Sequence, residues 1–465
     1  MRSDKLQNAI GGIDPDLIAR SEYPVRKKKG YKFVSAIAAV LVLAIGFGIL
    51  AGTSGQTGYT VYAGDMLAVY PTMAPYPKPF DPERYQMWKA DQEERARYFG
   101  QSAHLKSFVR ATAAELLAGD GENLVYSPVN IYIALAMLAE TADGNTRKQL
   151  LDLLGARNIE TLRAQTNAIW NANYNDDGVT SSILASSLWL NERYSFHKET
   201  LEILRDDYYA SSYQGKMGSE NFNKALQTWL NEQTRGLLSD QIDGAELSKE
   251  TILALATTVY FSAYWDSGFQ ERETKQGVFH GANGDCVADF MSESYNGFFC
   301  SGEKFSAVSK KLEGSGNMWF ILPDEGVSVN ELLADEEALS FLAASEDWEN
   351  KTKANVFLSL PKFEVSSSLD LEEPLKRLGV TDCFDETLAD FSPLIGETQA
   401  RVTGATHGAC VRVDEKGVEG AAFTLIAMGT TESSKPIGFT VDRPFIFVIT
   451  GEDGTPMFIG VVNQI

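Results

Sequence analysis

The sequence predicts an α+β domain with large β-sheets, preceded by one apolar segment that is long enough to cross a membrane. Within the domain, segments with helical periodicity come mostly first and strand-like runs mostly later. This order favours α+β architecture over alternating βαβ units. The apolar segment, residues 33–50, carries no charged side chain. With 465 residues, the chain is long enough for one large domain and an appendage.

Residues 1–32 form a short basic tail, and residues 33–52 are predicted to be a transmembrane helix. The run 33–50 provides 18 residues without a charge. Four basic residues, 26–29, stand before it, and the next basic residue after it is Lys78. The positive-inside rule therefore keeps the tail in the cytoplasm and places the rest of the chain outside. We expect a single-pass anchor in the cell membrane and an extracellular domain.

A cleaved signal peptide is the alternative for this segment, with the cut falling after the small residues 51–53. In that case the domain would be secreted. The long stretch before the apolar run and the length of the run itself favour the uncleaved anchor.

Residues 53–100 are predicted to be an extracellular spacer. Pro71, Pro75, Pro77 and Pro79 lie close together, a density that excludes a regular helix or a central strand. A stiff, extended chain would hold the domain away from the bilayer. A segment that wraps around the domain is the alternative.

Residues 101–465 have a globular composition and form the predicted domain. Helical periodicity covers 103–117, and 129–154 predicts two helices with a turn at 143–145. Strand-like runs follow at 183–190, 252–262, 317–322, 355–363, 409–414, 421–428, 437–441, 445–450 and 457–462.

The sequence argues against an enzyme, a metal protein and a nucleic-acid-binding protein. It contains no GxSxG, HExxH, P-loop or GxGxxG motif. The formal net charge of -22 disfavours nucleic acid and heparin-like polyanions as partners, and no cofactor is expected. The cysteines, which form no CxxC pair, are predicted to be buried thiols, with one or two disulfides as the alternative. They are Cys286, Cys300, Cys383 and Cys410.

Residues 417–436 stand out because they follow one strand-like run and precede another. Alternate residues from 418 to 428 are small or apolar, the pattern of a strand that can bury one face. Residues 429–434 have the composition of a loop. This periodicity alone favours an ordinary central strand followed by a turn.

Several motifs in this domain resemble those of the serpin family. Residues 439–449 (FTVDRPFIFVI) look like the family signature, and residues 414–422 (DEKGVEGAA) look like its hinge. Residues 123–129 (NLVYSPV) and 360–363 (LPKF) continue the resemblance in order along about 365 residues. The chain thus looks like a membrane-anchored serpin of the bacterial type.

The resemblance implies a large central sheet, further sheets, helices and an exposed reactive-centre loop. It also implies a monomeric inhibitor rather than a catalyst. A target serine protease cuts the loop and forms an acyl-enzyme, and the loop then inserts into the central sheet as an extra strand. Insertion adds main-chain hydrogen bonds and buries one apolar face.

The resemblance also assigns residues to the loop and its hinge. The hinge comprises Glu415, Gly417, Val418, Glu419, Gly420, Ala421 and Ala422. The cleaved bond is predicted between Thr431 and Glu432, and the alternatives are Met428, Thr430 and Ser433. The region 417–434 contains no Arg or Lys, so elastase-like or subtilisin-like targets are favoured over trypsin-like ones.

The zone where the sheet opens is predicted from the same resemblance. Ser127, Asn130, Thr257 and His407 fall where the family has its shutter network. Trp265 falls at the breach, where the loop enters the sheet. A non-inhibitory serpin that acts as a binding or chaperone module remains the alternative function, although the hinge has no proline and no inward-facing charge.

Overall fold

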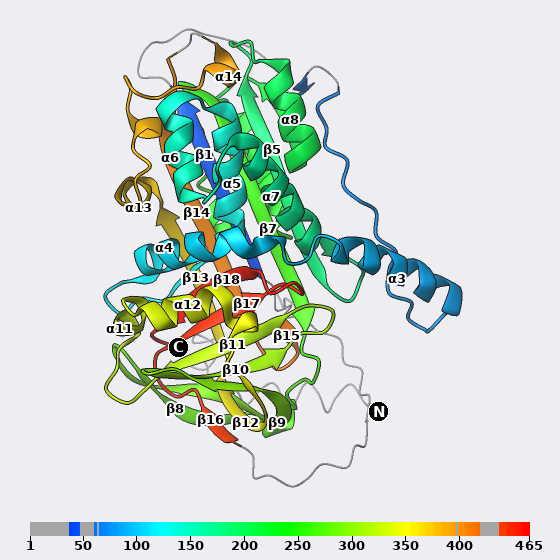
Figure 1. Cartoon of the computed structure of the whole chain (residues 1–465), viewed down its shortest axis with the longest axis vertical. Helices are drawn as coiled ribbons and strands as arrows, with labels where there is room; N and C mark the ends of the chain where they lie inside the picture. The colour runs from blue at the N-terminus through cyan, green and yellow to red at the C-terminus, as the bar shows by residue number, and fades with distance from the viewer. Residues whose placement is uncertain (1–36, 47–59, 63–64, 397–398, 419–436) are drawn as a thin grey trace, which may run out of the picture. The chain divides into compact units, whose positions relative to one another are not determined.

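The computed structural model describes residues 37–46, 60–62, 65–396, 399–418 and 437–465. Within these ranges the chain forms two mixed sheets with helices packed around them (Figure 1).

The first sheet is a nine-stranded sheet that contains the longest buried strands (Figure 1). Its main path runs in the order β13 (Phe363–Asp370), β14 (Arg401–Val413), β1 (Ile37–Gly46), β7 (Thr251–Tyr264), β5 (Ser181–Asn191), β6 (Ala210–Gly215) and β2 (Thr60–Val61). Off this path, β15 (Gly417–Val418) pairs with β7, and β4 (Asn175–Asp176) pairs with β5.

The second sheet also has nine strands and holds the C-terminal part of the chain. Its path is β16 (Ile437–Thr440), β12 (Thr352–Pro361), β9 (Gly284–Ser301), β10 (Phe305–Lys311), β11 (Asn317–Pro323), β17 (Phe445–Thr450), β18 (Pro456–Val462) and β3 (Leu124–Tyr126), with β8 (Lys275–Gly281) on β9. β17 and β18 are buried along their whole length, which explains why they read as continuous apolar runs.

Helices pack on the first sheet and along one end of the second (Figure 1). The α-helices are α3 (Pro82–Ala96), α4 (Leu105–Leu117), α5 (Pro128–Thr141), α6 (Gly144–Leu153), α7 (Ile159–Asn173), α8 (Lys198–Tyr208), α9 (Glu220–Gln233), α10 (Ser239–Ile242), α11 (Val329–Leu333), α12 (Glu336–Ala344), α13 (Glu372–Arg377) and α14 (Ser392–Ile395). Short 3-10 turns occur at η2 (Gln101–His104), η3 (Glu271–Glu273), η4 (Ser345–Asp347) and η5 (Asp382–Phe384).

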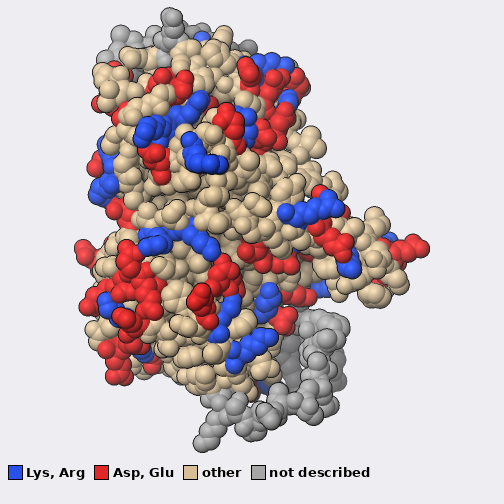
Figure 2. Space-filling view, viewed as in Figure 1, with Lys and Arg blue, Asp and Glu red and all other residues tan. Residues whose placement is uncertain are grey.

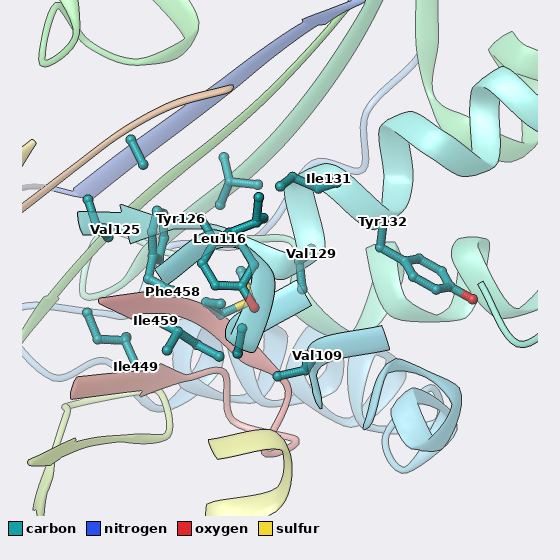
Figure 3. Packing of buried hydrophobic residues seen from close by; sticks show 14 of the residues in the cluster. Val109, Leu116, Val125, Tyr126, Val129, Ile131, Tyr132, Ile449, Phe458 and Ile459 are labelled. Atoms are coloured by element: carbon teal, nitrogen blue, oxygen red, sulfur yellow. The ribbon is translucent and has the colours of Figure 1, made fainter. Parts of the chain in front are cut away.

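Helix α5 is the centre of the core, and all 14 of its residues are buried. Its sequence is apolar on every side, as expected of a helix surrounded by other elements. Ser127 caps its first turn by accepting a hydrogen bond from the Asn130 backbone N–H, and Pro128 occupies the first helical position. Figure 3 shows Val129 of α5 and Phe458 and Ile459 of β18 within one buried hydrophobic cluster.

Residues 37–46 correct one prediction. They form strand β1, where the sequence predicted the middle of a membrane-spanning helix over 33–52. β1 is antiparallel to both β14 and β7, so its backbone groups pair with neighbouring strands on both sides. A charge-free run can satisfy its backbone inside a sheet as well as inside a helix. Among the described residues, no helix has the length and apolar character needed to cross a bilayer.

Several side chains between residues 60 and 100 contact the domain, although helix α3 projects from it (Figure 1). Tyr70 stacks on Trp170, with 5.9 Å between the ring centroids. The Trp88 indole N–H donates to the Asp177 carboxylate at 2.8 Å. Arg95 is 6% exposed and donates to the Ala172 carbonyl at 3.0 Å. At these three residues the segment contacts the domain, and the spacer over 53–100 stays a prediction.

Candidate functional site

The chain leaves β14 through a tight turn that brings it directly onto β7. Asp414 pairs with Gly417, and the Asp414 carboxylate accepts a hydrogen bond from the Lys416 N–H at 2.8 Å. β15 then pairs antiparallel with β7, with Gly417 opposite Tyr264 and Val418 opposite Ala263. Gly417 and Val418, two of the predicted hinge residues, therefore form a short strand paired with β7.

Only glycine fits at position 417. Its φ angle is +130°, a region that side chains rarely adopt. A Cβ atom there would lie 2.5 Å from the Trp265 nitrogen and 2.8 Å from the Ala263 carbonyl oxygen. The close backbone approach explains why glycine is required at this predicted hinge position.

The Glu415 side chain stabilises the turn. It is 7% exposed, and its carboxylate accepts a hydrogen bond from the Thr274 hydroxyl at 2.8 Å and forms an ion pair with Lys362 at 2.7 Å. Burial raises the pKa of the Glu415 carboxyl, but the bonds from Lys362 and Thr274 lower it by more, so the pKa lies below its ordinary value. The Glu415 carbonyl also accepts from the Phe269 N–H at 3.0 Å.

Trp265 also stabilises the turn, through two hydrogen bonds. Its indole N–H donates to the Asp414 carbonyl at 3.0 Å, and its backbone N–H donates to the Lys416 carbonyl at 3.1 Å. Its ring packs edge-on against Phe269 at 6.0 Å. The structure thus brings the predicted breach residue Trp265 together with the predicted hinge residues Glu415 and Gly417.

The sequence did not predict the buried Lys310, which lies next to Trp265. Lys310 is 1% exposed and forms an ion pair with Glu293. Its ammonium group lies 4.3 Å from the centroid of the Tyr295 ring and 4.5 Å from that of Phe269. Burial lowers the pKa of Lys310, and Glu293 partly offsets this. No pattern in the sequence marks this burial, because it depends on packing against rings that are distant along the chain.

Three of the four predicted shutter residues form a connected group at the start of α5. The Ser127 backbone N–H donates to Nε2 of His407 at 3.0 Å, so this ring nitrogen carries no proton. The Ser127 hydroxyl accepts from the Asn130 N–H at 3.3 Å. The side-chain amide of Asn130 is buried and has no hydrogen-bond partner among the described residues.

Thr257, the fourth, is separated from His407 by one strand. Leu41 of β1 pairs with His407 on one side and with Thr257 on the other. The Thr257 hydroxyl has no partner in the part of the chain that the structure describes. We call the strand position between β7 and β14 the slot, and residues 37–46 occupy it (Figure 1).

The remaining predicted loop residues lie outside the described residues. These are Glu419, Gly420, Ala421, Ala422, Met428, Thr430, Thr431, Glu432 and Ser433. The structure therefore describes the first two residues of the loop and the strand that follows it, β16, which pairs parallel with β12.

The four cysteines are free thiols, and three of them, Cys300, Cys383 and Cys410, are buried. Burial raises the pKa of each of these three thiols to about 12. No cluster of three metal-ligating side chains occurs within the described ranges. On the face in Figure 2, basic side chains are scattered among acidic ones.

Comparison with known proteins gives one consistent result. A family model described as serpin (serine protease inhibitor) matches residues 104–465. The chain is 28% identical over 361 residues to Serpin-ZX of Arabidopsis thaliana, which covers 73% of this chain and 91% of that protein. It is also 28% identical over 357 residues to a serine proteinase inhibitor of Cavia porcellus, covering 73% and 83%.

Solved structures agree in fold. The thermophilic serpin tengpin in its native state matches with a TM-score of 0.70 at 22% identity, covering 88% of this chain and 100% of that chain. An Arabidopsis serpin in its native stressed conformation matches with a TM-score of 0.67 at 23% identity, covering 78% and 98%. At these identities the likeness concerns the fold alone.

Proposed function

The chain belongs to the serpin family, a family of protease inhibitors rather than catalysts, and we propose from this premise that it inhibits serine proteases by a suicide-substrate mechanism. The protease serine attacks the carbonyl carbon of the bait bond, and the new amino terminus leaves. The acyl-enzyme stays attached to the upstream part of residues 417–436, the bait loop. That part enters the slot and carries the protease with it.

One observation carries this proposal: the hinge already lies on the sheet that the loop must enter. Gly417 and Val418 pair with β7 in the antiparallel direction that an inserted strand needs. Glu415 and Trp265 fix the turn that aims the loop along β7. Insertion then extends an existing pairing and does not have to nucleate a new one.

The sequence of the bait loop favours one class of target protease. Residues 417–434 contain no Arg or Lys, so a protease whose specificity pocket requires a cation would not cut there. Elastase-like or subtilisin-like proteases fit the small and aliphatic side chains. We keep Thr431–Glu432 as the first candidate bond, with Met428, Thr430 and Ser433 as the neighbouring alternatives.

The test uses the whole chain, purified in mild detergent and mixed with one elastase-like and one subtilisin-like protease. Denaturing gels should show a covalent band at the sum of the two masses. Mass spectrometry should find a released peptide that begins near Glu432. Cleavage of the loop with no adduct and no loss of protease activity, across a broad protease panel, would refute the inhibitory mechanism.

A non-inhibitory serpin that acts as a binding or chaperone module is the second candidate, and one observation favours it. The slot that the loop must enter already contains β1. In such a protein the loop would be cut as an ordinary substrate. The gel experiment separates the two candidates, because only the inhibitor forms an adduct.

The cellular location stays a prediction from the sequence. We propose that the domain is exported, because the basic group 26–29 precedes the apolar run 33–50 and no basic residue follows before Lys78. Protease protection of tagged chains in intact cells tests this topology. A C-terminal tag that resists external protease until the cells are opened would contradict it.

A further inference from the structure

We propose that residues 37–46 are an internal competitor of the bait loop: β1 fills the slot, and the loop can insert only after β1 leaves. This inference rests on the proposed function. It adds a built-in control, because the chain would inhibit a protease only when its own N-terminal segment is out of the sheet.

The strand registers place β1 and an inserted bait loop at the same positions in the first sheet. Val418 pairs with Ala263, so continuing the pairing along β7 by two residues places Gly420 opposite Phe261. On the other edge, Asp414 pairs with Gly417, and continuing that antiparallel register places Gly420 opposite Val411 of β14. Ile37 of β1 pairs with both Phe261 and Val411. Ile37 therefore lies where Gly420 would lie.

The overlap continues along the strand. Ala44 pairs with Ala254 of β7 and with Gly404 of β14. The same continuation of the hinge register brings Ala427 to these two partners. Residues 37–44 thus occupy, one for one and in the same direction, the positions of residues 420–427.

The sheet cannot hold both strands in one slot. Neighbouring strands lie about 4.7–4.9 Å apart, and each central strand uses its backbone groups on both edges. β1 already pairs with β7 on one edge and with β14 on the other. A single position, opposite Ser262, separates the end of β15 from the start of β1. The hinge can advance by one residue before it meets the occupied slot.

The register also identifies a position for an engineered disulfide that would hold β1 in the slot. Ala38 lies opposite Cys410, which is a free thiol. In an antiparallel pair, opposite Cβ atoms are about 4.5–5.5 Å apart on the same face, close to disulfide geometry. The variant Ala38→Cys in the full chain should therefore form a 38–410 disulfide on oxidation with copper phenanthroline, seen by mass spectrometry of linked peptides.

The matched controls differ by one position or one thiol. Ala39→Cys lies opposite Ala409 and should not cross-link with Cys410. The pair Ala38→Cys with Cys410→Ser removes the second thiol. The native cysteines are free thiols, so reduction should open only the engineered bond.

Two readouts then follow loop cleavage by a subtilisin-like protease. Melting temperature reports insertion, because an added strand stabilises the sheet, and the covalent band reports inhibition. We expect oxidised Ala38→Cys to lose both the gain in melting temperature and the covalent band, and reduction to restore them. Val40→Pro, which cannot act as a central strand residue, should raise the fraction of covalent complex above wild type.

The outcomes separate this inference from the proposed function. No 38–410 disulfide in a folded chain, or insertion that is equal in the oxidised and reduced states, would overturn the competition. No gain in melting temperature even after reduction would overturn both, because the loop would then never insert. A gain without a covalent band would keep the competition and reject the inhibitory function.

Discussion

Glycine at position 417 lets the hinge backbone pass close to Trp265. Gly417→Ala should destabilise the fold by about 1–3 kcal/mol, because φ is positive and the new Cβ would meet backbone atoms of β7. Urea unfolding of the whole chain measures this. Gly438→Ala is the control, since no atom lies within 4 Å of the position that its Cβ would take. Equal midpoints for the two variants would contradict the described turn.

Glu415 should give the fold a pH-dependent contribution. Its pKa is lowered on folding, so its stabilisation is complete above its unfolded pKa and is lost as pH falls through the folded value. Glu415→Gln should therefore lower the melting temperature at pH 7 and narrow its difference from wild type in acid. Glu325→Gln, on an exposed turn, controls for the loss of one negative charge. A constant difference between pH 7 and acid would contradict the ion pair with Lys362.

Lys310 and Glu293 form a largely buried ion pair next to Trp265. Lys310→Met alone should cost about 3–5 kcal/mol, because it leaves Glu293 largely buried without its partner. Replacing both residues with methionine should recover much of this loss. Chemical denaturation of the two single variants and the double variant gives the coupling energy. Additive losses would show that the two side chains do not interact.

At the scale of elements, the start of α5 connects a helix to the first sheet. Ser127→Ala should cost about 1 kcal/mol, because the Asn130 N–H loses its cap while the backbone bond from Ser127 to His407 stays. Thermal unfolding measures it. Ser219→Ala removes the corresponding cap of α9 and should cost a similar amount. A much larger loss at Ser127 would mean that its hydroxyl supports more than the cap.

Elements with strong apolar periodicity could be predicted from the sequence. β5, β7, β11, β17 and β18 fall where alternating or continuous apolar runs predicted strands. β9 was missed because much of it is exposed and polar, so its pattern lacks a buried face. β1 was predicted as a helix because an 18-residue charge-free run fits a bilayer equally well. Only the neighbouring strands β7 and β14 distinguish a strand in the slot from a helix in a bilayer.

Some residues of the candidate site could also be predicted from the sequence, and others could not. The family resemblance predicted Glu415, Gly417 and Trp265, and the structure places Trp265 against the turn that contains the other two. Lys310 could not be predicted, because its importance depends on burial against the rings of Tyr295 in β9 and Phe269 in a loop. Burial of a single lysine follows from packing and leaves no pattern in the sequence.

At the scale of the whole molecule, the net charge of -22 acts on every unfolding experiment. Self-repulsion among like charges opposes the compact state, and salt screens it. Raising sodium chloride from low to physiological concentration should therefore raise the melting temperature at pH 7. The same series near pH 4.7, the sequence pI, should show little change. A salt effect of equal size at both pH values would point to a cause other than net charge.

Strand β1 belongs to a run that could be hosted by two different environments, a protein sheet or a lipid bilayer. The slot satisfies its backbone through neighbouring strands, whereas a bilayer would satisfy it through a helix. If the competition proposed above holds, the two hosts exclude one another, lipid acts as a ligand of the slot-free state, and thermodynamic linkage makes the coupling reciprocal. In that case a bilayer that takes up the run would favour the slot-free state, in which the proposed inhibitor can insert its loop. Conversely, a protease that cuts the loop would favour release of the run from the sheet and its transfer to lipid, so that inhibition would also attach the chain to the nearest membrane.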